Sequence, residues 1–344
     1  MTALRSASQP AVRQAPPTRP RRALPAADAR LVVLLLALAL GSRGLLGDAL
    51  GNPAIRTWAT VFVAITVQAL PFLALGVLVS GAIAVLLSPA RLARLLPGSP
   101  LLAVPAAAVA GTALPGCECA SVPIAGRLAA RGVRTEGALA FMLASPAVNP
   151  VVLVATAVAF PGQPRMVLAR FLGSLLTAIA VGLVWSRLGR AVPLAAASRR
   201  LGLDFGPGDQ RQAWQRLAAA VRHDLFLSGG WLVVGAAAAA TLQVAVPRAA
   251  LLAVAQRPAL AAPALGALAV LLAICSEADA FVAASLWEFS LTARLVFLVV
   301  GPAVDVKLAA MQVGVFGRRF AARFAPLTFA VAVAAALLVG RALL

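Results

Sequence analysis

Long uninterrupted apolar runs constrain this chain more than any other feature of its sequence. The longest cover residues 58–87, 137–160 and 166–185. A helix needs about 20 apolar residues to cross the hydrocarbon core of a bilayer. Of the 344 residues, 62% are hydrophobic and only 12% are charged, whereas soluble domains have about 45–50% and about 25%. The sequence therefore predicts an all-α integral membrane protein.

Most of the apolar segments are long enough to span a membrane. The expected spans are residues 30–50, 57–87, 135–160, 166–187, 223–246, 292–315 and 321–341. Residues 101–131 and 259–289 differ, because each contains a break near its middle, at Gly116-Cys117 or Cys275-Ser276. Each half has about 15 residues, which at about 1.5 Å per residue is too short to cross. We expect about seven full spans plus two broken or re-entrant helical hairpins; the alternative is about 11 spans, with every half crossing.

The distribution of arginine indicates the orientation. If both hairpins return to the side from which they enter, 21 of the 29 arginines lie in the cytoplasm and eight outside. If each hairpin crosses once, the count is 15 against 14. The positive-inside rule favours the first arrangement, with a cytoplasmic N-terminus. The net charge of +19 is explained by these loops, and we expect no nucleic-acid partner because no nucleic-acid-binding motif accompanies it.

The composition changes once near the N-terminus. Residues 1–29 are rich in Pro, Ala and Arg, which predicts a disordered cytoplasmic tail. Residues 30–344 are expected to form one multi-pass membrane domain whose principal partner is the lipid bilayer.

The chain contains an internal duplication. Phe141–Asn149 (FMLASPAVN) matches Phe297–Asp305 (FLVVGPAVD) at an offset of 156 residues, and the same offset places Cys119 on Cys275. The expected repeats cover about residues 57–187 and about 220–341. Three predicted spans separate the two hairpins, and this odd number gives the halves opposite orientations. Inverted repeats with broken helices that meet near the midplane are a recurrent transporter architecture.

The few polar residues inside apolar stretches gather at matched positions of the repeat. A carboxylate at the bilayer centre costs about 2.5–3.5 kcal/mol or more, so it rarely lacks a function. All three cysteines lie in the hairpins, and thiolates bind soft ions or trivalent metalloids. The candidate substrate-binding and translocation residues are Cys117, Glu118, Cys119, Asn149, Cys275, Glu277, Asp279, Asp305 and Lys307. The candidate ligands for a metal cargo are Cys117, Cys119, Cys275 and Glu277, and the expected helix breaks are Gly116, Pro146, Pro150 and Pro302.

These features favour a secondary permease that moves a soft metal ion or metalloid between two inverted repeats. We expect no enzymatic activity, no catalytic residues and no cofactor, since no phosphate loop, Ser–His–Asp set or zinc-protease motif is present. One alternative is a transmembrane thiol oxidoreductase that relays electrons between Cys119 and Cys275. The other is the membrane subunit of a larger permease, with an accessory membrane or lipoprotein subunit.

Four ordered motifs surround the candidate residues. They are CECASVP at Cys117–Pro123, AFMLASPAVNP at Ala140–Pro150, CSEADAFVAAS at Cys275–Ser285 and FLVVGPAVDVK at Phe297–Lys307. These motifs resemble those of the YraQ/ArsP-type predicted permeases over about residues 57–320. The resemblance implies a permease of the bacterial inner (plasma) membrane, and one branch of that family exports trivalent organoarsenicals.

The resemblance also implies roles for individual residues. The Cys-x-Cys pattern of the family falls on Cys117 and Cys119, and its acidic second motif falls on Glu277, Asp279 and Asp305. Many relatives have Gly where this chain has Ala120. Together with Glu118, the acidic motif resembles a metal-linked branch more than the organoarsenical exporters. The expected cargo is therefore small and inorganic or organometallic.

Overall fold

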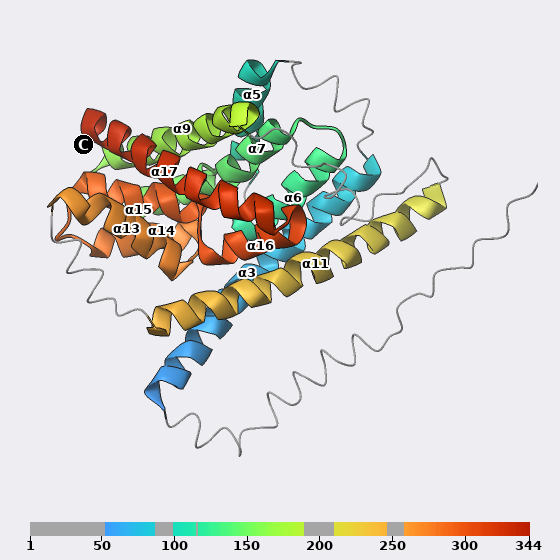
Figure 1. Cartoon of the computed structure of the whole chain (residues 1–344), viewed down its shortest axis with the longest axis horizontal. Coiled ribbons are helices and arrows are strands. Elements are labelled where there is room, and N and C mark those ends of the chain that lie inside the picture. Colours follow the sequence, from blue (N-terminus) through green and yellow to red (C-terminus); the bar gives the residue numbers. More distant parts are fainter. Residues whose placement is uncertain (1–51, 87–98, 115, 189–209, 246–257) are drawn as a thin grey trace, which may run out of the picture. The chain divides into compact units, whose positions relative to one another are not determined.

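The computed structural model describes residues 52–86, 99–114, 116–188, 210–245 and 258–344 (Figure 1). All regular structure in these ranges is α-helical. The first half contains α3 (Pro53–Leu86), α5 (Pro100–Thr112), α6 (Glu118–Ala130), α7 (Thr135–Ala147), α8 (Pro150–Ala159) and α9 (Pro164–Leu188). The second half contains α11 (Gln210–Ala245), α13 (Pro258–Leu272), α14 (Ser276–Ser285), α15 (Leu291–Ala303), α16 (Val306–Phe316) and α17 (Arg318–Leu343). The predicted tail 1–29 and the predicted span 30–50 lie outside the described residues.

Proline determines where many of these helices begin. Five of them, α3, α5, α8, α9 and α13, have proline as their first residue. Proline suits that position because its amide has no hydrogen to leave unsatisfied and its φ angle is already helical. The predicted duplication is thus accompanied by matched starts, since α5 begins at Pro100 and α13 begins at Pro258.

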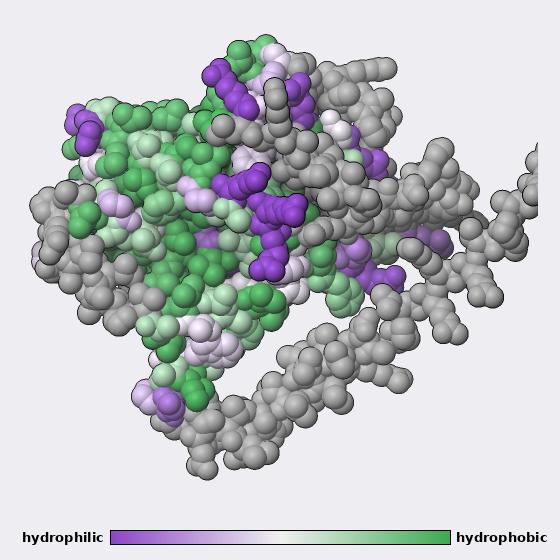
Figure 2. Space-filling model, in the orientation of Figure 1, coloured by the Kyte–Doolittle hydropathy of each residue, from purple (hydrophilic) through white to green (hydrophobic). Residues whose placement is uncertain are grey.

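Six segments of the described chain are long and apolar enough to cross a membrane. They are Pro53–Ile83, Thr135–Ala159, Pro164–Arg187, Leu217–Ala245, Leu291–Phe316 and Arg318–Leu343. Each corresponds to one of the predicted spans, and two of them consist of a pair of helices with a break, α7–α8 and α15–α16. Apolar residues also cover most of the visible described surface (Figure 2). The protein is therefore a multi-pass membrane helical bundle, as the composition predicted.

The first hairpin reverses direction within the bundle. Gly111 of α5 lies against the backbone of Phe141 and Ser145 in α7, and Gly137 of α7 lies against Ala107, so α5 runs parallel to α7. The end of α6 packs instead on the start of α7, so α6 runs antiparallel to α7. With 13 residues each, α5 and α6 are about 20 Å long. They enter and leave at the same end of the bundle, as predicted for residues 101–131.

The second hairpin has the same relation to α15. The side chain of Asp279 in α14 lies beside Gly301 near the end of α15. At the other end of α14, Arg294 at the start of α15 donates to the carbonyl oxygens of Ala283 and Ala284. Thus α14 runs antiparallel to α15. The preceding helix, α13, also packs on α15.

Four helices begin directly after a break, and they form two pairs. In the first pair, α6 and α16 pack together, and arginine-rich segments follow both of them: the loop 131–134 after α6 and the start of α17, Arg318–Arg323, after α16. In the second pair, α8 and α14 pack together and end near Arg294, whose guanidinium lies 4.7 Å from the ring centroid of Phe160. The two pairs therefore extend from the middle of the bundle toward opposite ends.

A buried ion pair joins three helices near the α6 end of the bundle. Arg127 of α6 donates to Asp224 of α11 through Nη2 at 2.6 Å and Nε at 3.1 Å. Ser80 of α3 donates to the same carboxylate at 2.7 Å. All three side chains are fully buried. We call this cluster of Ser80, Arg127 and Asp224 the Asp224 network.

Replacing Arg127 with Met should destabilise the protein by about 3–5 kcal/mol, because the Asp224 carboxylate would remain buried without its partner. The matched control is Arg134→Met, since Arg134 pairs with Glu136 at the same 2.6 Å distance but its side chain is 47% exposed. That control should cost less than about 1 kcal/mol. Thermal unfolding of the two variants in detergent measures the difference. Equal losses would show that the Asp224 network does not exist as described.

Candidate functional site

Four helix N-termini meet in the middle of the bundle. The N-cap residues of α6, α8, α14 and α16 are, in order, Cys117, Asn149, Cys275 and Asp305. All four are buried, and all four belong to the predicted set. The first backbone N–H groups of a helix have no partner within it, and the helix dipole favours negative charge there. The fold thus directs four partly positive helix ends into one buried region.

Asparagine and aspartate cap the two interrupted spans. The Asn149 side chain accepts from Val152 N at 3.0 Å, and the Asp305 side chain accepts from Leu308 N at 2.5 Å. Asn149 also donates to the carbonyl oxygen of Gly116 at 3.2 Å, which ties the turn of the first hairpin to the break in α7–α8. Its extended backbone is the conformation that the following proline favours.

The remaining predicted breaks lie beside these caps. Pro146 and Pro302 are each one residue before the end of their helix, α7 or α15, and Pro150 is the first residue of α8. Gly116 lies in the turn between α5 and α6.

Lys307 lies between two acidic residues that come from different halves of the chain. Its Nζ is 3.7 Å from Glu118 Oε2 and 3.6 Å from Asp305 Oδ2. All three side chains are at least 99% buried. Both Glu118 oxygens and Asp305 Oδ2 have no hydrogen-bond partner, so these atoms remain available to a ligand. Lys307 neutralises part of the acidic charge that the sequence placed in the apolar core.

The three cysteines are all buried and free. Cys117 and Cys119 interact through their side chains, and Cys275 is close enough to Cys117, Glu118 and Glu277 to interact electrostatically. Neither Cys117 nor Cys275 forms a side-chain capping hydrogen bond. Among the residues that the structure describes, no three acidic, thiol or imidazole side chains converge on a point that could hold a metal ion.

The helix caps change the predicted alignment of the two hairpins. The offset of 156 residues pairs Asn149 with Asp305, and both are N-caps. In the hairpins, however, the N-cap that corresponds to Cys275 is Cys117 rather than Cys119. The predicted Cys119–Cys275 equivalence is therefore wrong by two residues. The reason is that α6 has 13 residues and α14 only 10, so Cys117 lies 32 residues before Asn149 whereas Cys275 lies 30 residues before Asp305.

The two acidic residues of α14 have different environments. Asp279 is buried, and one of its carboxylate oxygens has no hydrogen-bond partner. A side chain on Gly301 would overlap that carboxylate, so the glycine makes room for it. Glu277 is partly exposed but interacts electrostatically with Glu118. All nine predicted substrate-binding residues thus lie in or beside the region where the helix ends meet.

Comparisons with known proteins agree with this arrangement. A family model described as "Predicted permease" (ArsP_1) matches residues 54–341, which include every helix that contributes to the candidate site. The chain belongs to this predicted permease family. The resemblance noted in the four motifs is confirmed by this match, and the match adds no information about the cargo.

Two relatives of this permease come from bacteria. The UPF0718 protein YcgR of Bacillus subtilis (strain 168) is 36% identical over 269 residues, which are 76% of this chain and 89% of the relative. A Streptococcus mutans (serotype c, strain ATCC 700610 / UA159) protein named "Putative two-component membrane permease complex subunit" is 31% identical over 284 residues. That alignment covers 81% of this chain and 94% of the relative. No solved structure matches the permease.

Sequence reasoning missed one cation of the permease site. Arg170 of α9 is fully buried; it donates to Thr156 Oγ1 of α8 at 2.6 Å and to the carbonyl oxygen of Ser276, at the start of α14, at 2.8 Å. It also interacts electrostatically with Asp279, Glu277 and Glu118. Its position six residues into an apolar span was the available signal, because a buried arginine needs a partner.

Replacing Arg170 with Lys should lower transport and the thermal stability of the permease. A lysine ammonium cannot span Thr156 and Ser276 as the planar guanidinium does, and each lost hydrogen bond to a charged group costs about 1.5–3 kcal/mol. The matched control is Arg165→Lys, because Arg165 is in the same helix but is exposed. A wild-type melting temperature and wild-type transport for Arg170→Lys would contradict this role.

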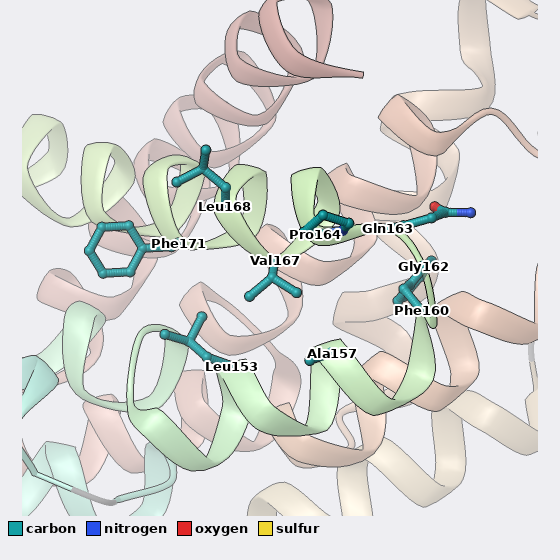
Figure 3. Close-up of a pocket in the computed structure, with 9 residues that line it drawn as sticks. All are labelled: Leu153, Ala157, Phe160, Gly162, Gln163, Pro164, Val167, Leu168 and Phe171. Atoms are coloured by element: carbon teal, nitrogen blue, oxygen red, sulfur yellow. The ribbon is translucent and has the colours of Figure 1, made fainter.

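A separate apolar groove lies between α8 and α9 (Figure 3). Its volume is about 530 Å³, and its lining includes Leu153 of α8 and Val167, Leu168 and Phe171 of α9. None of the nine candidate residues lines it. The groove offers apolar side chains but no charged group, so it does not extend the candidate site.

Proposed function

We propose that this permease is a secondary transporter in which cargo passes through the region where Cys117, Asn149, Cys275 and Asp305 meet. The observation that supports this most strongly is that four buried N-caps of broken helices come together, two from each half of the chain. Broken helices expose backbone groups and polar side chains at membrane depth only where they surround a site or a pathway.

The two halves are proposed to form an inverted repeat. The element order α3, α5, α6, α7, α8, α9 is repeated as α11, α13, α14, α15, α16, α17. The ends of α6 and α16 precede arginine-rich segments, the loop 131–134 and the start of α17, which we assign to the cytoplasm of a bacterial inner membrane. On this assignment, α8 and α14 extend toward the outside, and the N-terminal tail is cytoplasmic.

The proposed cargo is a soft metal ion or metalloid. Cys117 and Cys119 already interact, and two adjacent thiolates suit such an ion. The carboxylate oxygens of Glu118, Asp279 and Asp305 that accept no hydrogen bond would balance the charge of a cation or accept protons that the thiols release. Because no three candidate ligands converge among the described residues, we propose that the ligands close around the cargo only when it binds.

The test is a strain that lacks the permease, complemented with the wild-type or variant chain. Sensitivity to zinc, copper and arsenite and the cellular content of each should change in the deletion strain and return with the wild type. Glu277→Gln should fail to complement although it reaches the membrane. Glu288→Gln, in the exposed loop after α14, is the control and should complement. Full complementation by Glu277→Gln would remove this residue from the site.

The similarity to the Streptococcus mutans complex subunit supports an accessory subunit for this chain as well. Such a partner should co-purify in mild detergent with the full-length permease.

A reversible disulfide between Cys119 and Cys275 in native membranes would favour the electron-relay function over transport.

A further inference from the structure

The two long helices α3 and α11 break the correspondence between the halves. Several other helix contacts occur in matched pairs: α6 packs on α16 as α14 packs on α8, and α9 packs on α7 as α17 packs on α15. In contrast, α11 packs closely on α16, whereas its counterpart α3 lies against α6, through Gly76 beside the backbone of Ala120. Both long helices therefore lie on the α6 and α16 side.

Because α3 does not pack on α8 as α11 packs on α16, one face of α8 is exposed. The correspondence between the two repeats identifies this face. In α16, Gly235 of α11 lies against Lys307 and Ala310, and Trp231 lies directly on Gly314. At the offset of 156 residues, these three α16 positions correspond to Val151, Val154 and Val158 of α8. The valines are 52%, 63% and 63% exposed. This face of α16 is thus covered by α11, whereas the equivalent face of α8 is exposed.

The residues that would cover the α8 face are present in α3. The helices α3 and α11 match at an offset of 159 residues, which pairs Phe72 with Trp231 and Gly76 with Gly235. An aromatic residue and a glycine therefore have the same spacing in both helices. If α3 contacted α8 as α11 contacts α16, Phe72 would lie on Val158 and Gly76 on Val154.

The Asp224 network stabilises the arrangement seen here. It holds α3 and α11 to α6 through Ser80, Arg127 and Asp224. The second half has no equivalent network. At the offset of 159 residues, Ser80 corresponds to Ala239 and Asp224 to Ile65; at the 158 residues that separate the N-caps Cys117 and Cys275, Arg127 corresponds to Ser285. The two ends of the bundle are therefore held by different interactions. A state in which α3 and α11 lay at the other end would differ in stability from the one seen here.

We propose that α3 and α11 are the gate of the permease, closed against α6 and α16 in this structure and against α8 and α14 in a second state. In the second state, Phe72 packs on Val158, Gly76 packs on Val154, and the Asp224 network is broken. This inference rests on the transport function and the inverted orientation proposed above. With α6 and α16 ending in the cytoplasm, the present structure is the state closed to the cytoplasm. Exchange of contacts between repeat-equivalent helices then gives alternating access.

Two engineered cysteine pairs in the full-length protein test the gate in native membranes. Trp231→Cys with Gly314→Cys should form a disulfide in the present state, and Phe72→Cys with Val158→Cys should form one in the second state. The four single-cysteine variants are the controls, with the buried native cysteines retained. Asp224→Asn should raise the yield of the Phe72–Val158 pair several-fold and lower that of the Trp231–Gly314 pair.

A second measurement places its probes at exposed residues. Spin labels at Val67 and Val154, which are 60% and 63% exposed, should give two distances, with the shorter one enriched by Asp224→Asn. A single distance that Asp224→Asn does not change, together with no Phe72–Val158 disulfide, would overturn the gate. Neither experiment uses a cargo, so an error in the proposed cargo would leave these results unchanged.

Discussion

Replacing Cys117 and Cys275 together with serine is expected to abolish transport while the permease still reaches the membrane in normal amounts. Both thiols are at helix N-caps but form no capping hydrogen bond. Serine is among the preferred N-cap residues, so the helices should keep their starts. A hydroxyl does not replace a thiolate toward a soft ion, so cargo binding should be lost. Cellular metal and metalloid content, measured with membrane abundance, gives the result.

The control for this double variant is Ala113→Ser, which adds a hydroxyl at an exposed position in the turn of the first hairpin. It should transport like the wild type. If the double serine variant also transported normally, the thiols of Cys117 and Cys275 would have no part in binding, and the cargo would have to be recognised by Cys119 and the acidic residues.

The second large effect is expected for Lys307→Met, which should destabilise the folded permease by about 3–5 kcal/mol. The physical reason is that Glu118 and Asp305 would lose the only cation that lies within 4 Å of both among the described residues. Methionine has a similar volume, so packing should change little. Thermal unfolding in detergent measures the loss.

A double variant separates this charge effect from packing. Adding Glu118→Gln to Lys307→Met removes one of the unpaired carboxylates, so it should recover part of the lost stability. If Lys307→Met were as stable as the wild type, or if Glu118→Gln made it worse, the three residues would not form the buried ion cluster described here.

The sequence contained enough information for the spans and the breaks. Hydropathy located six of the described spans because a bilayer requires long apolar helices, and the two hairpins followed from the short half-helices on either side of Cys117 and Cys275. The candidate residues were recognisable for the same reason. In an apolar chain, a buried acid such as Asp279 or Asp305 is conspicuous.

Other features could not be derived from the sequence. Arg127 is followed by further arginines in the loop after α6, and this run of positive charge predicts a cytoplasmic position. In the structure, Arg127 is instead buried and donates to Asp224 of α11. Arg170 lies inside the predicted span 166–187, but its partners Thr156 and Ser276 come from other helices. The Cys119–Cys275 equivalence failed because a sequence rich in Ala, Leu and Val aligns in several registers. Only the helix starts reveal that Cys117 is the equivalent residue.

The most direct test of the account is the side of the membrane on which each hairpin opens. Gly132→Cys lies in the loop after the first hairpin and Glu288→Cys in the loop after the second, and both positions are exposed. In intact cells, an impermeant maleimide should label Glu288→Cys alone, and Gly132→Cys should react only after the membrane is opened. Labelling of both from the same side would contradict the inverted arrangement and, with it, the meeting of opposed helix ends at the bilayer centre.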